Sequence, residues 1–167
     1  MKIELKNIKY SDFASEETNC YEATIYIDGK KVGTVNNGGK GGCDNIYPYE
    51  VETRINQYAK TLPVRKLGFI DPQTGKEFEC PQSAETIFGD LMDDYLCGKD
   101  LKKALKTKIL FMKDKQVWET KRMDAIVFKA TLAKGNDELI KNLKAEVILN
   151  FLPMDKALQL YKEGSRP

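Results

Sequence analysis

The chain has 167 residues, with 27 Lys and Arg against 25 Asp and Glu and no histidine. This length fits one domain or two small ones, and the hydrophobic fraction of 41% is enough to form a core. The absence of histidine excludes Ser-His-Asp and Cys-His catalysis, zinc sites with histidine ligands and imidazole pH switches. A formal net charge of +2 gives only a weak electrostatic footprint for duplex DNA.

The cysteines are scattered and include no C-x-x-C pair, whereas the ligands of structural zinc sites come in close pairs. We therefore expect no metal and no other cofactor. The first ten residues contain no apolar stretch of the signal-peptide kind, and no segment approaches the roughly 18 apolar residues of a membrane span. The prediction is a cytoplasmic protein with free thiols and no membrane partner.

The chain begins with strand patterns. Residues 2–9 favour an edge strand, and the alternating run 21–27 favours a strand with its odd-numbered residues on one face. The Asp28-Gly29 pair is typical of a tight hairpin turn, so 21–27 is expected to pair with 30–35.

Helical spacing follows. Apolar residues recur at helical intervals from Val51 to Leu62, and Pro63 ends this helix. A second hairpin is expected over 67–80. The next helix is expected to begin at Ser83 and end at Gly98, with a short further helix over 100–105.

The last third of the chain mixes both types of element. The expected elements are strands at 108–112 and 116–119, a segment at 125–132 that fits either a strand or a helix, a helix from 136, a strand at 146–150 and a helix at 154–161. This order predicts an α+β fold of antiparallel hairpins packed with amphipathic helices. One compact domain over 1–167 is expected, with a division into 1–64 and 65–167 as the alternative.

The segment 36–45 is the first candidate site because glycine lets backbone N–H groups approach an anion closely, and a helix follows. Its spacing matches neither the P-loop nor the dinucleotide-binding fingerprint. The alternatives are a tight connector, a grip on a nucleotide-like anion and a contact with a partner protein. The candidate residues are Asn37, Gly38, Gly39, Lys40, Gly41 and Gly42.

The second candidate is an acidic helix face formed by Asp90, Asp93 and Asp94. The segment 77–96 holds six acidic residues and no basic one, which favours a basic partner surface. The segment 99–122 reverses the balance, with nine basic residues against three acidic ones and with interleaved aromatic residues. That pattern leaves single-stranded nucleic acid as a further alternative partner.

The segments Ser15–Gly33 and Asn37–Gly42 together resemble small uncharacterised proteins of bacteriophages and mobile elements, which pair a strand–DGKKVG–strand hairpin with a glycine-rich turn. The resemblance covers about the first 45 residues and carries no catalytic residue. It implies that the protein is an accessory factor; some phage accessory factors of this kind bind and block host defence proteins.

These patterns predict a non-catalytic binding protein, and the resemblance implies that it is phage- or prophage-encoded and modulates or inhibits a host protein. The alternatives are a small-molecule or nucleotide-binding protein that uses the glycine-rich loop, and an accessory factor that binds single-stranded nucleic acid. No pattern in the sequence predicts the oligomeric state.

Overall fold

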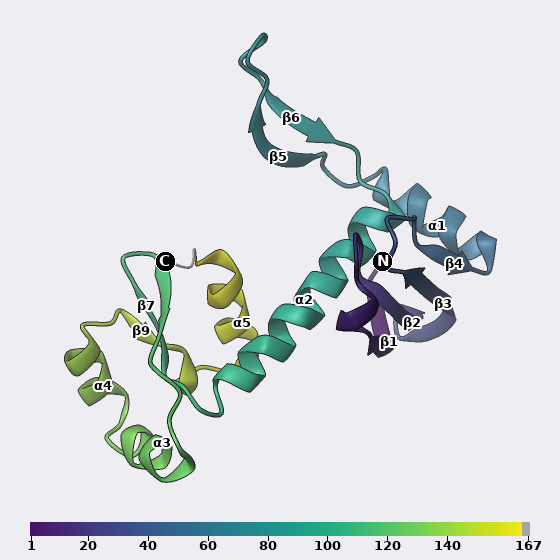
Figure 1. Cartoon of the computed structure of the whole chain (residues 1–167). Helices are drawn as coiled ribbons and strands as arrows, with labels where there is room; N and C mark the ends of the chain where they lie inside the picture. Colours follow the sequence, from purple (N-terminus) through teal and green to yellow (C-terminus); the bar gives the residue numbers. More distant parts are fainter. Residues whose placement is uncertain (165–167) are drawn as a thin grey trace. The chain divides into compact units, whose positions relative to one another are not determined.

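The computed structural model describes residues 1–164 and contains both helices and antiparallel strands (Figure 1). Each strand pair in this part of the chain is antiparallel, and helices lie between the hairpins along the sequence. The α+β fold class expected from the sequence is therefore confirmed.

The chain divides into two compact units, Met1–Asp93 and the remainder from Asp94. The boundary lies inside the long helix α2 (Ala84–Ala104), whereas the alternative division expected from the sequence lay at 64/65. Pro63 follows α1, but the chain then runs through a hairpin into α2, whose first turns carry the buried residues Ala84, Phe88 and Met92. Those residues place the start of α2 in the core of the first unit.

The first unit is built on a four-stranded sheet in sequential order, β1 (Ile3–Tyr10), β2 (Cys20–Ile27), β3 (Lys30–Gly38) and β4 (Asn45–Tyr47). The expected hairpin turn is confirmed, since Asp28 has φ 49° and Gly29 has φ 80°. Both values are those of the turn that matches the twist of paired strands. The odd-numbered residues of β2 share a buried face, as the alternation predicted: Tyr21, Ala23, Ile25 and Ile27.

Helix α1 (Tyr49–Ala59) adds a second buried stripe to this unit, formed by Val51, Ile55 and Ala59. It connects to α2 through a hydrogen bond in which the backbone N–H of Ala84 donates to the Asn56 side chain over 2.8 Å. Between the two helices lies a separate two-stranded hairpin, β5 (Arg65–Ile70) and β6 (Glu77–Cys80).

The second unit has a three-stranded sheet in the order β8-β7-β9, formed by β7 (Leu110–Lys113), β8 (Gln116–Glu119) and β9 (Val147–Ile148). Its further helices are α3 (Ala125–Leu132), α4 (Asn136–Leu143) and α5 (Met154–Glu163). The ambiguous segment 125–132 is thus a helix. Asp124 is the N-cap of this helix, since its side chain accepts hydrogen bonds from the N–H groups of Ile126 and Val127.

Two expectations about helix and strand ends are wrong. Helix α2 continues past Gly98 to Ala104, so there is no separate helix beginning at Asp100. A glycine inside a helix costs about 1 kcal/mol, but burial of a leucine such as Leu101, which is 0% exposed, stabilises by about 1.5–3 kcal/mol. The strand expected at 146–150 is limited to two residues because a 3₁₀ turn (Leu149–Phe151) follows.

Candidate functional site

The glycine-rich loop between β3 and β4 is held by the side chain of Asn37, which is only 8% exposed. Its Oδ1 accepts hydrogen bonds from the hydroxyl of Thr18 and from the N–H of Gly39, each over 2.9 Å. Its Nδ2 donates to the carbonyl of Gly42 over 2.9 Å and to a carboxylate oxygen of Asp44 over 3.1 Å. Asn37 therefore closes the loop from inside.

Three N–H groups of this loop, those of Gly39, Gly41 and Asp44, are engaged within the protein. Gly39 donates to Asn37, Gly41 donates to the hydroxyl of Thr18, and Asp44 donates to the carboxylate of Glu85. The Gly39 carbonyl in turn accepts from the backbone N–H groups of residues 16–18. The N–H groups of Gly39, Gly41 and Asp44 are therefore not available to an anion, which needs free N–H groups.

The surroundings of the loop are acidic. A cavity of about 200 Å³ beside it is lined by Tyr21, Asp44, Glu85 and Met92 among others. The hydroxyl of Tyr21 donates to Asp44 over 2.8 Å. Burial raises the pKa of Asp44 above its usual value, opposed by the hydrogen bonds that it accepts, and burial also raises the pKa of Tyr21. Two carboxylates facing this cavity disfavour an anionic ligand.

Cys43, on the exposed part of the loop, is not an activated thiol. The negative charge of Glu85 raises its pKa, so the thiolate is disfavoured. Within residues 1–164, all four cysteines are free and no group of three or more Cys, Asp and Glu side chains is arranged to hold a metal ion. In the same part of the chain no helix is both long and apolar enough to cross a bilayer.

The acidic residues predicted from the sequence do not form one open surface. Asp90 forms an ion pair with Arg65 at 2.9 Å, and Asp94 forms one with Lys162. Asp93 is exposed. Two of the three carboxylates therefore already have cationic partners inside the protein, which weakens their attraction for a basic partner.

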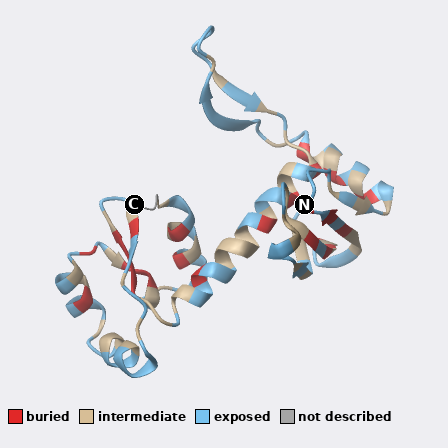
Figure 2. Cartoon of the chain, in the orientation of Figure 1, coloured by how far each residue is buried: buried red, intermediate tan, exposed pale blue. Residues whose placement is uncertain are grey.

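The surface that sequence reasoning missed is the β5–β6 hairpin. All six residues of β5 are exposed, and the hairpin is pale blue along nearly all its length in Figure 2. Its large apolar side chains are exposed as well: Val64 by 49%, Leu67 by 43%, Phe69 by 70%, Ile70 by 68% and Phe78 by 49%. We call these five residues the apolar arm.

The register of the hairpin puts Ile70 on the same face as its partner Glu77 and Phe78 on the opposite face. Lys66 pairs with Glu79 and Ile70 pairs with Glu77, so the residues 67–69 bulge opposite Phe78. Gly68, at φ 74°, takes a conformation that a larger residue adopts with strain. Lys66 and Glu77 form an ion pair at 3.3 Å across the two strands.

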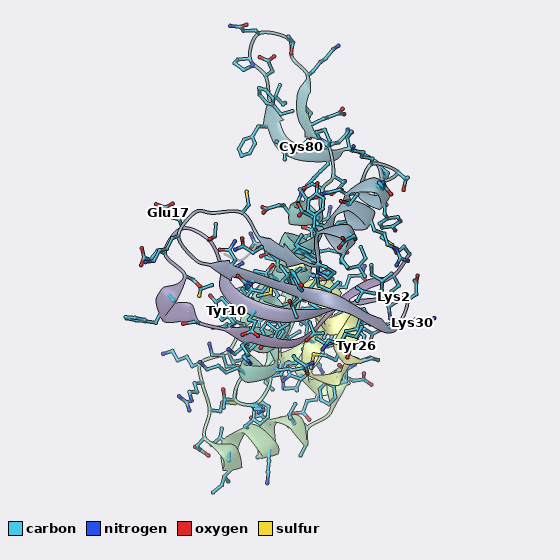
Figure 3. The ribbon with its side chains drawn as sticks, turned by 90° about the vertical axis from the view of Figure 1, so that its right-hand side faces the viewer. Lys2, Tyr10, Glu17, Tyr26, Lys30 and Cys80 are labelled. Carbon is cyan, nitrogen blue, oxygen red and sulfur yellow. The ribbon has the colours of Figure 1, made fainter. Side chains whose placement is uncertain are left out.

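The apolar arm is only partly covered by the described part of the chain, since its five side chains remain between 43% and 70% exposed. The extensive contacts of β5 within residues 1–164 are those with β6. Cys80 lies at the base of the hairpin, and side chains project outward along both strands beyond it (Figure 3). A lone two-stranded hairpin is marginally stable in water, and exposed apolar patches of this kind mark interaction sites.

The sequence did contain a signal for this surface. Phe69, Ile70 and Phe78 stand in a hairpin whose turn and strand ends are polar. Sequence alone left open whether another element buries them.

Comparison of the chain with models of known protein families, with curated proteins and with solved structures finds no match. The resemblance of the first 45 residues to bacteriophage proteins therefore stays a prediction.

Proposed function

We propose that this protein is a non-catalytic binding protein that captures another protein through the apolar arm of the β5–β6 hairpin. The observation that carries the proposal is the exposure of all six residues of β5, a strand whose extensive contacts among the described residues are those with β6. Burying side chains such as Phe69 and Phe78 against a partner supplies the largest favourable term in protein association.

The chemistry of the hairpin specifies the partner surface. Residues 64–80 contain three basic and three acidic residues, so net charge does not select the partner. The partner must instead offer an apolar groove with polar edges that accepts the bulge at 67–69 and Phe78.

The tip of the hairpin argues against a lipid surface as the target. Asp71 accepts hydrogen bonds at the turn from the Thr74 hydroxyl over 2.6 Å and from the Gln73 N–H over 2.9 Å. The hydrogen bond from Thr74 lowers the pKa of Asp71, so the tip carries a stable negative charge. A charged tip enters a bilayer at high cost, whereas a side-on protein groove leaves it in water.

A second copy of the chain is a weaker fit. Edge-to-edge pairing between copies of β5 requires a regular edge, and bulges interrupt such pairing. The bulge at 67–69 lies in the middle of β5. Docking of side chains into a different protein is therefore the favoured mode. If the captured partner is a host protein, the proposal extends to a phage- or prophage-encoded factor that modulates or inhibits it.

The test is quantitative capture from a host lysate with matched variants. The double variant Phe69→Ser/Phe78→Ser should lose a specific captured protein by roughly tenfold or more. The control Ile126→Ser changes a residue that is 82% exposed on α3 and should retain it. Equal capture by both variants, or a wild-type dimer in light scattering that the double variant abolishes, refutes the proposal.

A further inference from the structure

The second unit contains a basic cavity that neither candidate site explains. It has a volume of about 540 Å³ and lies between the C-terminal end of α2, the segment leading into β7, the segment after β8 and helix α5. Its charged lining residues are Asp100, Lys103, Lys106, Lys108, Glu119 and Arg122.

The charge of this cavity is positive and incompletely neutralised. Lys108 forms an ion pair with Glu119. Lys103, Lys106 and Arg122 form no ion pair with any residue of the described range 1–164. Three cations without an ion-pair partner in that range thus line one cavity, and the one remaining carboxylate in its lining is that of Asp100.

The framework of the cavity is fixed by hydrogen bonds. The side chain of Asn150 donates to the carbonyl of Lys108 over 2.9 Å and accepts from the N–H of Leu110 over 2.8 Å. The N–H of Met123 donates to the carbonyl of Thr107 over 2.8 Å, which ties the segment carrying Arg122 to the segment carrying Lys106 and Lys108. These hydrogen bonds hold the backbone that carries the cations, while the side chains of Lys103, Lys106 and Arg122 are exposed and can adjust to an anion.

The walls also contain groups that suit the rest of a ligand. Tyr161 is buried, with 8% of its surface exposed, and contributes an aromatic wall. The carboxylate of Asp100 and the hydroxyl of Thr107 can accept hydrogen bonds from ligand hydroxyl or amino groups. The volume lies within the range of small-molecule pockets, about 300–1,000 Å³, and exceeds what a lone phosphate would fill.

We infer that this cavity binds a small phosphorylated molecule, of the nucleoside phosphate class. Lys103, Lys106 and Arg122 hold the phosphate groups, with Arg122 able to bind two phosphate oxygens at once. Asp100 and Thr107 contact the sugar or base. The glycine-rich loop takes no part, and the site is independent of the apolar arm.

The test is calorimetric titration of the full chain with ADP at low ionic strength. Saturable binding is expected, with no binding of adenosine, and the affinity should fall as salt is added. The double variant Lys106→Gln/Arg122→Gln should bind ADP at least about tenfold more weakly. Lys129→Gln, on the exposed surface of α3 in the same unit, is the matched control and should bind like the wild type.

A second titration distinguishes the source of the phosphate. Oligothymidylate supplies phosphates on a single strand and should bind more weakly than ADP, because the cavity is bounded on several sides. Tighter binding of the oligonucleotide, absence of ADP binding, or equal ADP affinity in the double variant and the control overturns the inference. Circular dichroism of each variant verifies that the fold is retained.

Discussion

Replacement of Asn37 by alanine gives a direct measure of how the glycine-rich loop is held. The substitution removes four hydrogen bonds, from Thr18 and Gly39 and to Gly42 and Asp44. Each such bond contributes a net 0.5–1.5 kcal/mol, and more where the partner is charged, so the loss should be about 3 kcal/mol of unfolding free energy. Because the N–H of the buried Gly39 is then left without its acceptor, the cost is not offset by new contacts with water.

The assay is urea unfolding followed by far-ultraviolet circular dichroism, together with hydrogen exchange of residues 36–45. The matched control is Asn36→Ala. Asn36 is exposed, and its side-chain oxygen accepts one long bond, 3.4 Å, from Asn45. The control should lose about 0.5 kcal/mol or less. A loss below about 1 kcal/mol for Asn37→Ala, with loop exchange unchanged, would show that this side chain does not hold the loop.

Two further predictions concern the same unit. Gly39→Ala should destabilise the protein, because Gly39 has φ 81° and an added Cβ would meet the carbonyl of Ala14. Gly38→Ala should not, because a Cβ at that position meets nothing within 4 Å. Equal melting temperatures for the two variants would contradict this prediction. For Asp44, burial raises the folded-state pKa above the usual 3.8, so the folded state binds the proton more tightly than the unfolded chain and this group's contribution to stability falls as the pH rises from 3.8 through the raised pKa. The unfolding free energy of the wild type minus that of Asp44→Asn, measured from about pH 3 to about pH 7 where carboxyl groups titrate, should fall as the pH rises; a difference that stays constant with pH would refute the assignment.

Local sequence patterns predicted most elements because the forces that set them are local. The alternation of residues 21–27 and the Asp28-Gly29 turn fixed the first hairpin, since strand period and turn geometry depend on neighbouring residues. The C-terminal helix and its end at Gly164 were likewise predicted from local sequence. Element ends that depend on distant packing were predicted wrongly. A helix end was expected at Gly98, but the helix continues because burial of Leu101 stabilises its next turn.

The candidate sites were predicted less well because burial and pairing are not local properties. Asn37 was identified as a site residue, and the structure shows it as the internal closure of the loop. Asp90 and Asp94 were identified as open charges, yet their partners Arg65 and Lys162 are distant in sequence. The spacing of residues along the sequence does not indicate ion pairs between such distant segments.

By itself, the sequence determined the α+β class, the positions of most strands and helices and, through the absence of histidine, the catalytic chemistries that the chain lacks. The tertiary structure decided which of the apolar and charged residues remain available. It leaves Phe69 and Phe78 uncovered and places Lys106 and Arg122 around one cavity. The physical reason is that exposure and charge clustering arise from contacts between segments far apart in the chain, while secondary structure arises largely from contacts between neighbours.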